Sequence, residues 1–267
     1  ADKAGLKPGD KIIKVNNKDV SGMELDDVVE LIKNKKKVNI IVKRDNKEKE
    51  ITLKQNTVVI PSVSSRIVES NNKKVGVLNV SIFAANTYKQ FKNKLDDLEN
   101  KKIDSLIIDV RQNSGGHLDQ VSKILSLFMK QDKVIYQIKT KKGVEKYYST
   151  GKKSKNYNVV VLIDNGSASA SEILAAAMNE SYGATLIGEK TYGKGTVQKE
   201  YMLSSGASIK YTVENWLTPK GKSINGKGIS PTIEVALSDE YTNNPADEND
   251  NQLQEAIKFL TEEKKTN

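Results

Sequence analysis

Three serines alternate with small residues in the stretch NGSASASEIL, residues 165 to 174. The stretch follows NVVVLI, residues 158 to 163, whose apolar β-branched side chains are typical of a buried strand. The Asn165-Gly166 turn therefore predicts that the serines lie where a strand ends and a helix begins. A hydroxyl placed there is exposed beside free backbone N–H groups, which suits a developing oxyanion. The alternative is a helix start that uses Ser and Ala only for close packing on a sheet.

A serine nucleophile needs a general base, and this sequence offers few candidates. The only histidine, His117, lies far upstream of the serines and has the alternative of a packed or surface residue. A lysine can replace histidine as a base where burial lowers the pKa of its amine. Lys194 lies between two glycines in GEKTYGKGTVQ, residues 188 to 198, and in an extended chain Gln198 shares its face and could hold its amine. The alternative is a plain glycine turn, because the phosphate-binding pattern GxxxxGK[ST] is absent.

The composition of the 267 residues narrows the possible classes of protein. Lysine and arginine outnumber aspartate and glutamate by 43 to 34, which gives a net charge of +9. The lysine-rich runs at 33–54 and 152–155 contain almost no aromatic residues, so we expect solvated surface and no nucleic-acid partner. The absence of cysteine excludes a thiol nucleophile and thiolate metal sites, and one histidine excludes a zinc site with several His ligands. We therefore expect neither a metal nor another cofactor.

Features of the chain that bear on its location are few. No apolar run has membrane-spanning length, and the sequence contains no signal peptide. The chain opens on ADKAGLKPGD without an initiating methionine. We therefore expect a fragment, with any membrane anchor or targeting signal upstream of it.

The first 56 residues predict a small separate unit. The segment AGLKPGDKIIKVNNKDV, followed by a short amphipathic helix and two strands, resembles the second half of a PDZ domain. The strand and loop that grip a peptide carboxylate come earlier in such modules and are missing here. A scaffold remnant without binding function is the alternative. The elements expected in this unit are a strand at 11–15, a helix at 24–33 and strands at 38–43 and 50–53.

From residue 57 a strand-like connection leads to a region in which strands and helices alternate, which predicts an α/β layer architecture. A polar tail at 238–250 is expected to be loose. A terminal amphipathic helix follows, with Leu253, Ile257 and Leu260 on one face, available to the core or to a homo-oligomer contact. Strands are expected at 75–80, 105–110, 134–140, 147–150, 158–163 and 184–188, a hairpin at 201–203 and 207–213, and helices at 88–98, 118–128 and 169–180.

Several separated motifs together resemble the carboxyl-terminal processing, or tail-specific, proteases, which use a Ser–Lys dyad. GSASASEILAAAM resembles the family's nucleophile segment, and the resemblance implies that Ser169 is the nucleophile. GEKTYGKGTVQ resembles its lysine segment, which implies Lys194 as the base, 25 residues later, and Gln198 as the residue that orients it.

DVRQNSGG, residues 109 to 116, resembles the family's DLRxNxGG loop. The resemblance implies an oxyanion hole made by the N–H of Ala170 and that of Gly115 or Gly116. Glu172 matches a family carboxylate, with a first-turn helix acid favoured by the helix dipole as the alternative. NGKGISPTIEV, residues 225 to 235, resembles a late family signature.

The resemblance covers residues 1 to 236 and sets the expectations for the chain as a whole. The sequence departs from the family pattern at Ser114 and His117, and it lacks the start of the PDZ module. The expected fold is an α/β sandwich protease core of the ClpP/crotonase-like type behind a truncated PDZ module. The expected boundaries are 1–56 for the PDZ part, 57–236 for the protease core and 237–267 for the acidic tail and helix.

The function implied by the resemblance is cleavage of proteins at or near their C-terminal tails, with the PDZ module recognising the tail. The expected partners are proteins or peptides with free C-termini, and the expected location is the bacterial cell envelope or the outside of the cell. A catalytically silent scaffold of the same fold is the first alternative. A crotonase-like enzyme acting on a coenzyme thioester is the second, although it would need neither Lys194 nor a PDZ half.

Overall fold

The computed structural model describes residues 4–33, 35–55 and 60–262. The chain divides into two compact units, Ala1–Ile60 and Pro61–Asn267. The connection expected from residue 57 begins outside the described residues, and its later part forms the strand β5 (Val63–Ser70).

The first unit is a four-stranded antiparallel sheet with one helix. Its core consists of alternate strand residues such as Val38, Ile40 and Val42, which point to the same side of the sheet. Asn16 and Asn17, like Asp45 and Asn46, have positive φ, so both hairpins have tight two-residue turns. The short turn makes the last two strands longer than predicted. The elements are β1 (Lys11–Val15), β2 (Lys18–Asp19), α1 (Leu25–Ile32), β3 (Lys37–Arg44) and β4 (Lys47–Lys54), in the sheet order β2-β1-β3-β4.

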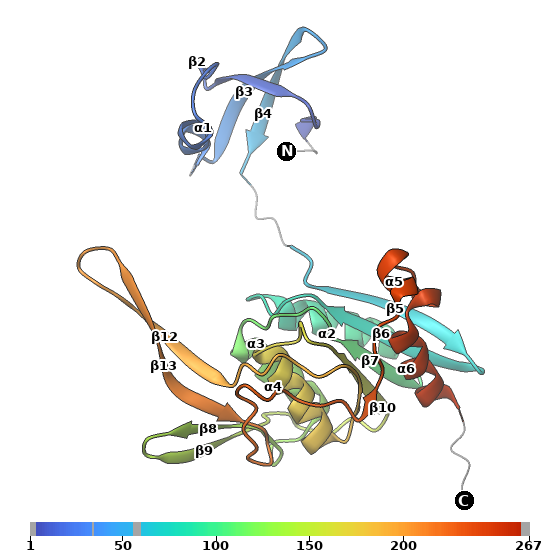
Figure 1. Ribbon diagram of the computed structural model, residues 1–267. Helices are drawn as coiled ribbons and strands as arrows, with labels where there is room; N and C mark the ends of the chain where they lie inside the picture. Colours follow the sequence, from blue (N-terminus) through green and yellow to red (C-terminus); the bar gives the residue numbers. More distant parts are fainter. Residues whose placement is uncertain (1–3, 34, 56–59, 263–267) are drawn as a thin grey trace, which may run out of the picture. The chain divides into compact units, whose positions relative to one another are not determined.

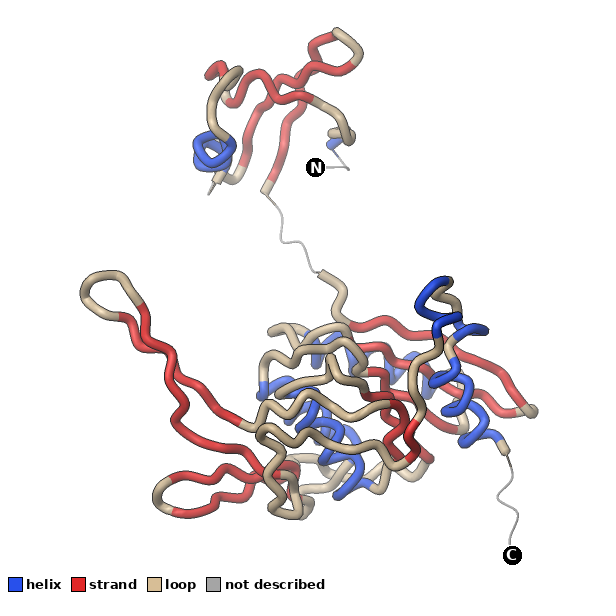
Figure 2. The backbone as a smooth tube through the Cα atoms, in the orientation of Figure 1, coloured by secondary structure: helices blue, strands red, loops and turns tan. Residues whose placement is uncertain are grey.

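A six-stranded sheet is the centre of the second unit. Figures 1 and 2 show helices packed on its two faces. Its order is β14-β11-β10-β7-β6-β5, and every neighbouring pair is parallel except the antiparallel pair β5–β6 at one edge. The carboxyl ends of the parallel strands therefore meet at one edge of the sheet, where α/β proteins place their sites. The strands after β5 are β6 (Lys73–Val80), β7 (Ser105–Asp109), β10 (Asn158–Ile163), β11 (Thr185–Gly188) and β14 (Ile233–Glu234).

Helices cover both faces of this sheet, and the central strands supply a core to each. In β7, Leu106 and Ile108 join the core beneath three helices, whereas Ile107 joins the core on the opposite face. This two-sided burial explains why the strand sequences are almost wholly apolar. The three helices on the first face are α2 (Thr87–Asn100), α3 (Leu118–Phe128) and α4 (Ala170–Ala177), the last continued by one π-helical turn, Met178–Tyr182. The opposite face is covered by α6 (Asn251–Thr261).

A second, four-stranded sheet has the order β12-β13-β8-β9. The hairpin predicted at 201–203 and 207–213 is much longer, because β12 (Thr196–Met202) and β13 (Ser208–Leu217) pair along their whole length and extend away from the body of the unit. The strand predicted at 147–150 lies earlier, because β9 (Gly143–Tyr148) pairs directly with β8 (Val134–Thr140) across a short turn. The edge strand β12 begins two residues after Lys194.

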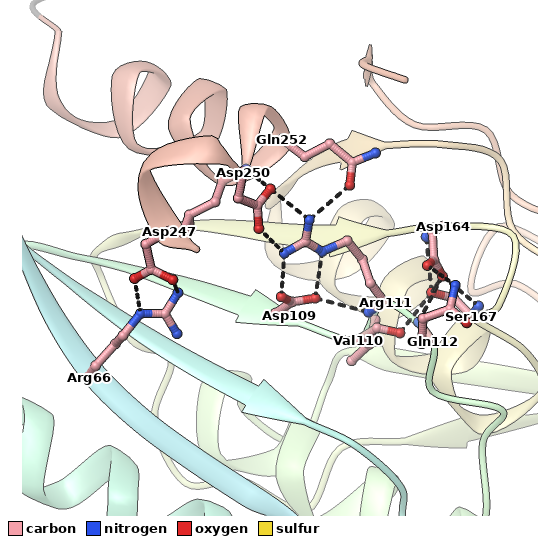
Figure 3. Close-up of polar contacts among 11 residues, drawn as sticks. Arg66, Asp109, Val110, Arg111, Gln112, Asp164, Ser167, Asp247, Asp250 and Gln252 are labelled. Atoms are coloured by element: carbon pink, nitrogen blue, oxygen red, sulfur yellow. Dashed lines mark hydrogen bonds and ion pairs between the residues drawn. The ribbon is translucent and has the colours of Figure 1, made fainter. Parts of the chain in front are cut away.

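The expectation of a loose tail at 238–250 is wrong. This segment forms α5 (Asp239–Asn243) and a 3₁₀ turn, Asp247–Asn249. Two of its carboxylates are held by arginines (Figure 3): Nε of Arg66, in β5, lies 2.6 Å from Asp247 Oδ2, and Arg111, in the loop after β7, binds Asp250.

The apolar face of α6 is occupied within the same unit. Leu253, Ala256, Ile257 and Leu260 are buried against Val75, Ile107 and their neighbours on the sheet. Of the two alternatives left open by the sequence, the core and a homo-oligomer contact, this face therefore packs on the core. None of the described helices combines the length and the apolar character needed to cross a membrane.

Candidate active site

The serine-rich turn joins the end of β10 to the start of α4, and its three serines have different environments. Ser167 is buried, and its Oγ donates to Val110 O at 2.8 Å. Ser171 is also buried, and its Oγ donates to Asn113 O at 2.7 Å. Ser169 alone among the three is half-buried and lines a cavity. The Ser169 hydroxyl is therefore accessible to a reacting group, whereas the hydroxyls of Ser167 and Ser171 fix the loop.

Ser169 occupies a strained backbone conformation. Its φ is 56° and its ψ is −114°, outside the regions that L-residues prefer, which costs about 1–3 kcal/mol. The surrounding bonds maintain it: Asp164 Oδ1 accepts from Gly166 N and Ser167 N, each at 3.0 Å. A strained serine at a strand-to-helix turn is the geometry of a nucleophile elbow.

The Glu172 carboxylate connects the serine segment to the lysine segment. Glu172 is fully buried, and its Oε2 accepts from Ser169 N at 2.8 Å and from Lys194 N at 2.9 Å. Its Oε1 accepts from Gly193 N at 2.7 Å and from Thr191 Oγ1 at 2.6 Å. Four donors thus satisfy one buried carboxylate, which fixes the backbone of both candidate catalytic residues. Glu172 does lie in the first turn of α4, as the alternative interpretation stated. Its carboxylate also bonds to Thr191, Gly193 and Lys194, outside the helix.

The loop that carries Lys194 is pressed against the segment 224–228. A Cβ on Gly195 would lie 2.7 Å from Asn225 N, and one on Gly193 would lie 2.8 Å from Gly228 N, so only glycine fits at either position. The Lys194 carbonyl accepts from Trp216 Nε1 at 2.8 Å. These contacts explain both the glycines around the lysine and the late motif NGKGIS.

The side chains of Lys194 and Gln198 line the same cavity as Ser169. Gln198 is exposed and follows an irregularity in the pairing of β12 with β13 between Val197 and Gln198. In the part of the chain that the structure describes, no hydrogen bond joins the Lys194 amine to Ser169 or to Gln198. Ser169, Lys194 and Gln198 therefore line one cavity, but no hydrogen bond connects their side chains among the described residues.

The two candidate oxyanion glycines differ clearly. Gly115 is buried, and its N–H is already used by Asn113 Oδ1 at 2.9 Å. Gly116 is exposed and lines the cavity together with Ala170. Among the described residues, the N–H groups of Gly116 and Ala170 make no hydrogen bond. The geometry therefore favours Gly116 over Gly115 as the partner of Ala170.

The cavity that these residues share has a volume of about 270 Å³ and a mixed lining. Apolar side chains of Leu118, Ile138, Ile173 and Trp216 face it beside the polar groups. A larger cavity of about 800 Å³ lies over β8 and β13, and neither Ser169 nor Lys194 lines it. The candidate active site is therefore identified by the serine and the lysine that line the smaller cavity, and not by cavity volume. His117 lies on the surface with its side chain 60% exposed, 3.9 Å from Asp119, and does not line the cavity.

Arg111 connects the loop after β7 to the C-terminal segment, as Figure 3 shows. One of its guanidinium nitrogens lies 2.7 Å from both Asp109 Oδ2 and Asp250 Oδ2. Burial alone would lower the pKa of Arg111, but hydrogen bonds to these carboxylates raise it above its ordinary value. The next residue, Gln112, donates from its N and Nε2 to Asp164 at 2.9 and 2.6 Å.

A continuous chain of polar contacts therefore runs from the start of α6 to the nucleophile turn. Sequence analysis missed it, because Arg111 and Asp250 are 139 residues apart. The unusual presence of an arginine directly after a buried strand was the one available signal.

Comparisons with known proteins agree with this architecture. The model of peptidase family S41 matches residues 74–235, and that of the PDZ domain matches residues 1–44. The chain is 38% identical over 263 residues to the carboxy-terminal processing protease CtpB of Bacillus subtilis. The aligned region covers 97% of this chain and 54% of that protein. The chain is also 38% identical over 243 residues to CtpA of the same organism, covering 90% and 52%. The solved photosystem II D1 C-terminal processing protease matches with a TM-score of 0.62 and 27% identity over 88% of this chain and 65% of that one.

The fold and the sequence define an α/β serine-peptidase core behind a PDZ module, which confirms the predicted fold class. The chain belongs to peptidase family S41. It spans about half the length of the two Bacillus relatives that it matches.

Proposed function

We propose that this protein is a serine endopeptidase with a Ser–Lys dyad. In this mechanism the neutral amine of Lys194 takes the proton from Ser169 Oγ as the oxygen attacks a peptide carbonyl. The N–H groups of Ala170 and Gly116 stabilise the oxyanion. The protonated lysine then gives its proton to the leaving amine. Water hydrolyses the acyl-enzyme, with Lys194 again acting as the base.

The observation that carries this proposal is the buried carboxylate of Glu172, which accepts the backbone N–H of Ser169 and that of Lys194 at once. A serine on a turn and a lysine in a loop would otherwise be two independent surface residues. Both side chains line one cavity, and the two unbonded N–H groups of Gly116 and Ala170 border it. Gln198 lines it as well, and we propose that its amide orients the lysine amine.

The substrate class follows from the relatives. CtpA and CtpB of Bacillus subtilis are named carboxy-terminal processing proteases. On the strength of these names we propose cleavage at or near free C-terminal tails. A PDZ domain match precedes the peptidase core in the sequence, and the part of that domain expected to grip a tail carboxylate is absent from this chain. Because the Bacillus and Staphylococcus relatives are bacterial proteins, an envelope or external location in a bacterium completes the proposal.

Cleavage of β-casein by the protein, followed by electrophoresis and mass spectrometry, tests the proposed activity. Ser169→Ala and Lys194→Ala should each abolish cleavage while circular dichroism and the melting temperature stay close to those of the parent. Ser204→Ala and Lys190→Ala are matched controls, because both residues are exposed and neither lines the cavity. Retained cleavage in either dyad variant would refute the mechanism.

A catalytically silent scaffold is the alternative function. It predicts that the parent cleaves nothing, and that a covalent serine-directed probe such as a fluorophosphonate fails to label Ser169. Labelling of the parent that is lost in Ser169→Ala excludes the scaffold even when no casein is cut.

A further inference from the structure

A groove of about 500 Å³ adjoins the candidate active-site cavity, between α3 and the strands β8 and β9. Leu118, in the first turn of α3, lines both the cavity and the groove. On β8, Ile138 lines the cavity, and Tyr136, two residues earlier on the same face of the strand, lines the groove. Both walls of the cavity thus continue into the groove.

Three tyrosines, Tyr136, Tyr147 and Tyr148, form the aromatic part of the groove lining. The rings of Tyr136 and Tyr147 stack with centroids 4.6 Å apart and planes 12° from parallel. Tyr136 is buried and Tyr148, at the outer edge, is 50% exposed. Tyr148 therefore leaves a large apolar surface open to a ligand.

The polar groups of the groove are largely satisfied among themselves. Ser126 Oγ accepts from Thr150 N at 3.0 Å, which ties α3 to the segment after β9. Lys123 Nζ lies 3.1 Å from Asp119 Oδ2, so the two charges on the α3 wall neutralise each other. A neutral, apolar side chain suits such a surface better than a charged ligand does.

We propose that this groove is a specificity subsite for an aromatic or large apolar side chain of the substrate polypeptide. The inference rests on the proposed peptidase function and adds the choice of substrate residue. An extended chain points every second side chain in the same direction, about 6.5–7 Å apart. Ile138 and Tyr136 have that same repeat on β8. A substrate with one side chain against Ile138 therefore places the side chain two residues away over the Tyr136–Tyr147 pair, where aromatic rings gain by stacking.

A series of peptides tests the subsite. Each peptide carries a single phenylalanine, moved one position at a time along a background of alanine, serine and a fixed cleavage site, and kcat/KM is measured for each. We expect the parent to prefer phenylalanine over alanine by about two- to tenfold at a position two residues from the one that fills the cavity. Tyr148→Ala, which removes the outer edge, and Lys123→Trp, which fills the groove from α3, should both bring that ratio close to one.

The two altered side chains are exposed, so the fold should tolerate both changes. Tyr241→Ala is the matched control, because Tyr241 belongs to α5 and lies outside the groove, and it should keep the full preference. A phenylalanine preference that both groove variants retain, or no preference at any position, overturns the proposal.

A second readout does not depend on turnover. The Ser169→Ala variant is irradiated with peptides in which p-benzoylphenylalanine replaces the preferred residue, and the cross-linked residues are mapped by mass spectrometry. We expect cross-links to Leu118, Tyr147 or Tyr148. Cross-links elsewhere, such as on the hairpin or the PDZ unit, or none at all, overturn the subsite. If the parent cuts no peptide yet the cross-links map to the groove, the peptidase proposal fails while the groove remains a peptide-binding site.

Discussion

The backbone N–H of Ser169 and that of Lys194 donate to the same oxygen of one buried carboxylate, Glu172 Oε2, at 2.8 and 2.9 Å. In the sequence, the serine segment precedes the strand β11 and the lysine segment follows it. Because a carboxylate accepts from several donors without donating, it can hold two backbone N–H groups close together. The Glu172 carboxylate therefore holds the backbones of the candidate nucleophile and the candidate base close together.

Glu172→Gln should consequently impair the reaction although the Ser169 and Lys194 side chains are themselves unchanged. The amide has a single accepting oxygen for four donors, and its NH₂ group faces N–H groups instead of an acceptor. We expect the free energy of unfolding to fall by about 2–4 kcal/mol. We also expect kcat/KM on a peptide to fall by roughly 100-fold, because small misplacements of reacting groups have that effect.

Urea denaturation and steady-state kinetics check this expectation. Glu180→Gln is the control, because Glu180 accepts from Lys220 N and does not line the cavity. Full activity in Glu172→Gln would show that the bridge does not position the dyad.

The choice of Gly116 over Gly115 predicts which amide responds to an oxyanion. A peptide aldehyde that adds to Ser169 Oγ forms a tetrahedral adduct with an oxygen in the proposed hole. We expect the amide ¹H resonances of Gly116 and Ala170 to move downfield on adduct formation. The Gly115 resonance should stay in place, since Asn113 Oδ1 already accepts its N–H. A ¹H–¹⁵N spectrum of the selectively labelled protein makes the measurement, and a moving Gly115 resonance with a static Gly116 one would reverse the assignment.

Much of the fold could be predicted from the sequence because its signals are local. Buried strands such as Ser105–Asp109 and Asn158–Ile163 are continuous apolar runs bounded by turn residues, and their ends were predicted to within a residue. Helices with a clear apolar stripe were predicted equally well, such as the one at Leu118–Phe128. Ser169 and Lys194 were selected by resemblance, and the structure brings both to one cavity.

What could not be predicted depends on contacts between distant parts of the chain. The two glycines of DVRQNSGG look alike in sequence. They differ in the structure, where Gly115 is buried with its N–H bonded to the Asn113 side chain and Gly116 is exposed at the cavity. The acidic segment 238–250 has the composition of a loose tail. It is ordered because Arg66 of β5 and Arg111 of the loop after β7 pair with Asp247 and Asp250, and a single sequence shows no such pairing.

The two arginine–aspartate pairs of that segment predict different effects on stability. Asp250 is buried with its side chain 3% exposed, and it also accepts from Leu253 N at the start of α6. Asp250→Asn leaves the buried guanidinium of Arg111 with one fewer carboxylate, and we expect a loss of about 3–5 kcal/mol. Asp247 is 52% exposed, and Asp247→Asn should cost at most about 1 kcal/mol.

Urea unfolding of both variants, followed by the fluorescence of Trp216, compares the two pairs within one segment. Because Arg111 precedes Gln112, which binds Asp164 of the nucleophile turn, Asp250→Asn should also lower kcat more than Asp247→Asn does. Equal losses of stability in the two variants would contradict the difference in burial.

The first unit predicts a separate response to acid, carried by Asp10 and Arg44. Hydrogen bonds from the Arg44 side chain, at 2.6 Å, and from Lys7 N lower the pKa of Asp10 from 3.8 to about 2. A carboxyl group whose pKa is lower in the folded state stabilises the fold above its unfolded pKa, and the contribution is lost as the pH falls from about 4 towards 2. We therefore expect the unit Ala1–Ile60 to lose stability in that pH window, and Asp10→Asn to lose stability at neutral pH and to respond less to acid. A ¹³C titration of the Asp10 carboxyl group, together with amide exchange of the unit at pH 5 and pH 2.5, tests this. If Asp10 titrates near 3.8, Arg44 does not stabilise its charged form, and the acid response must come from other carboxylates.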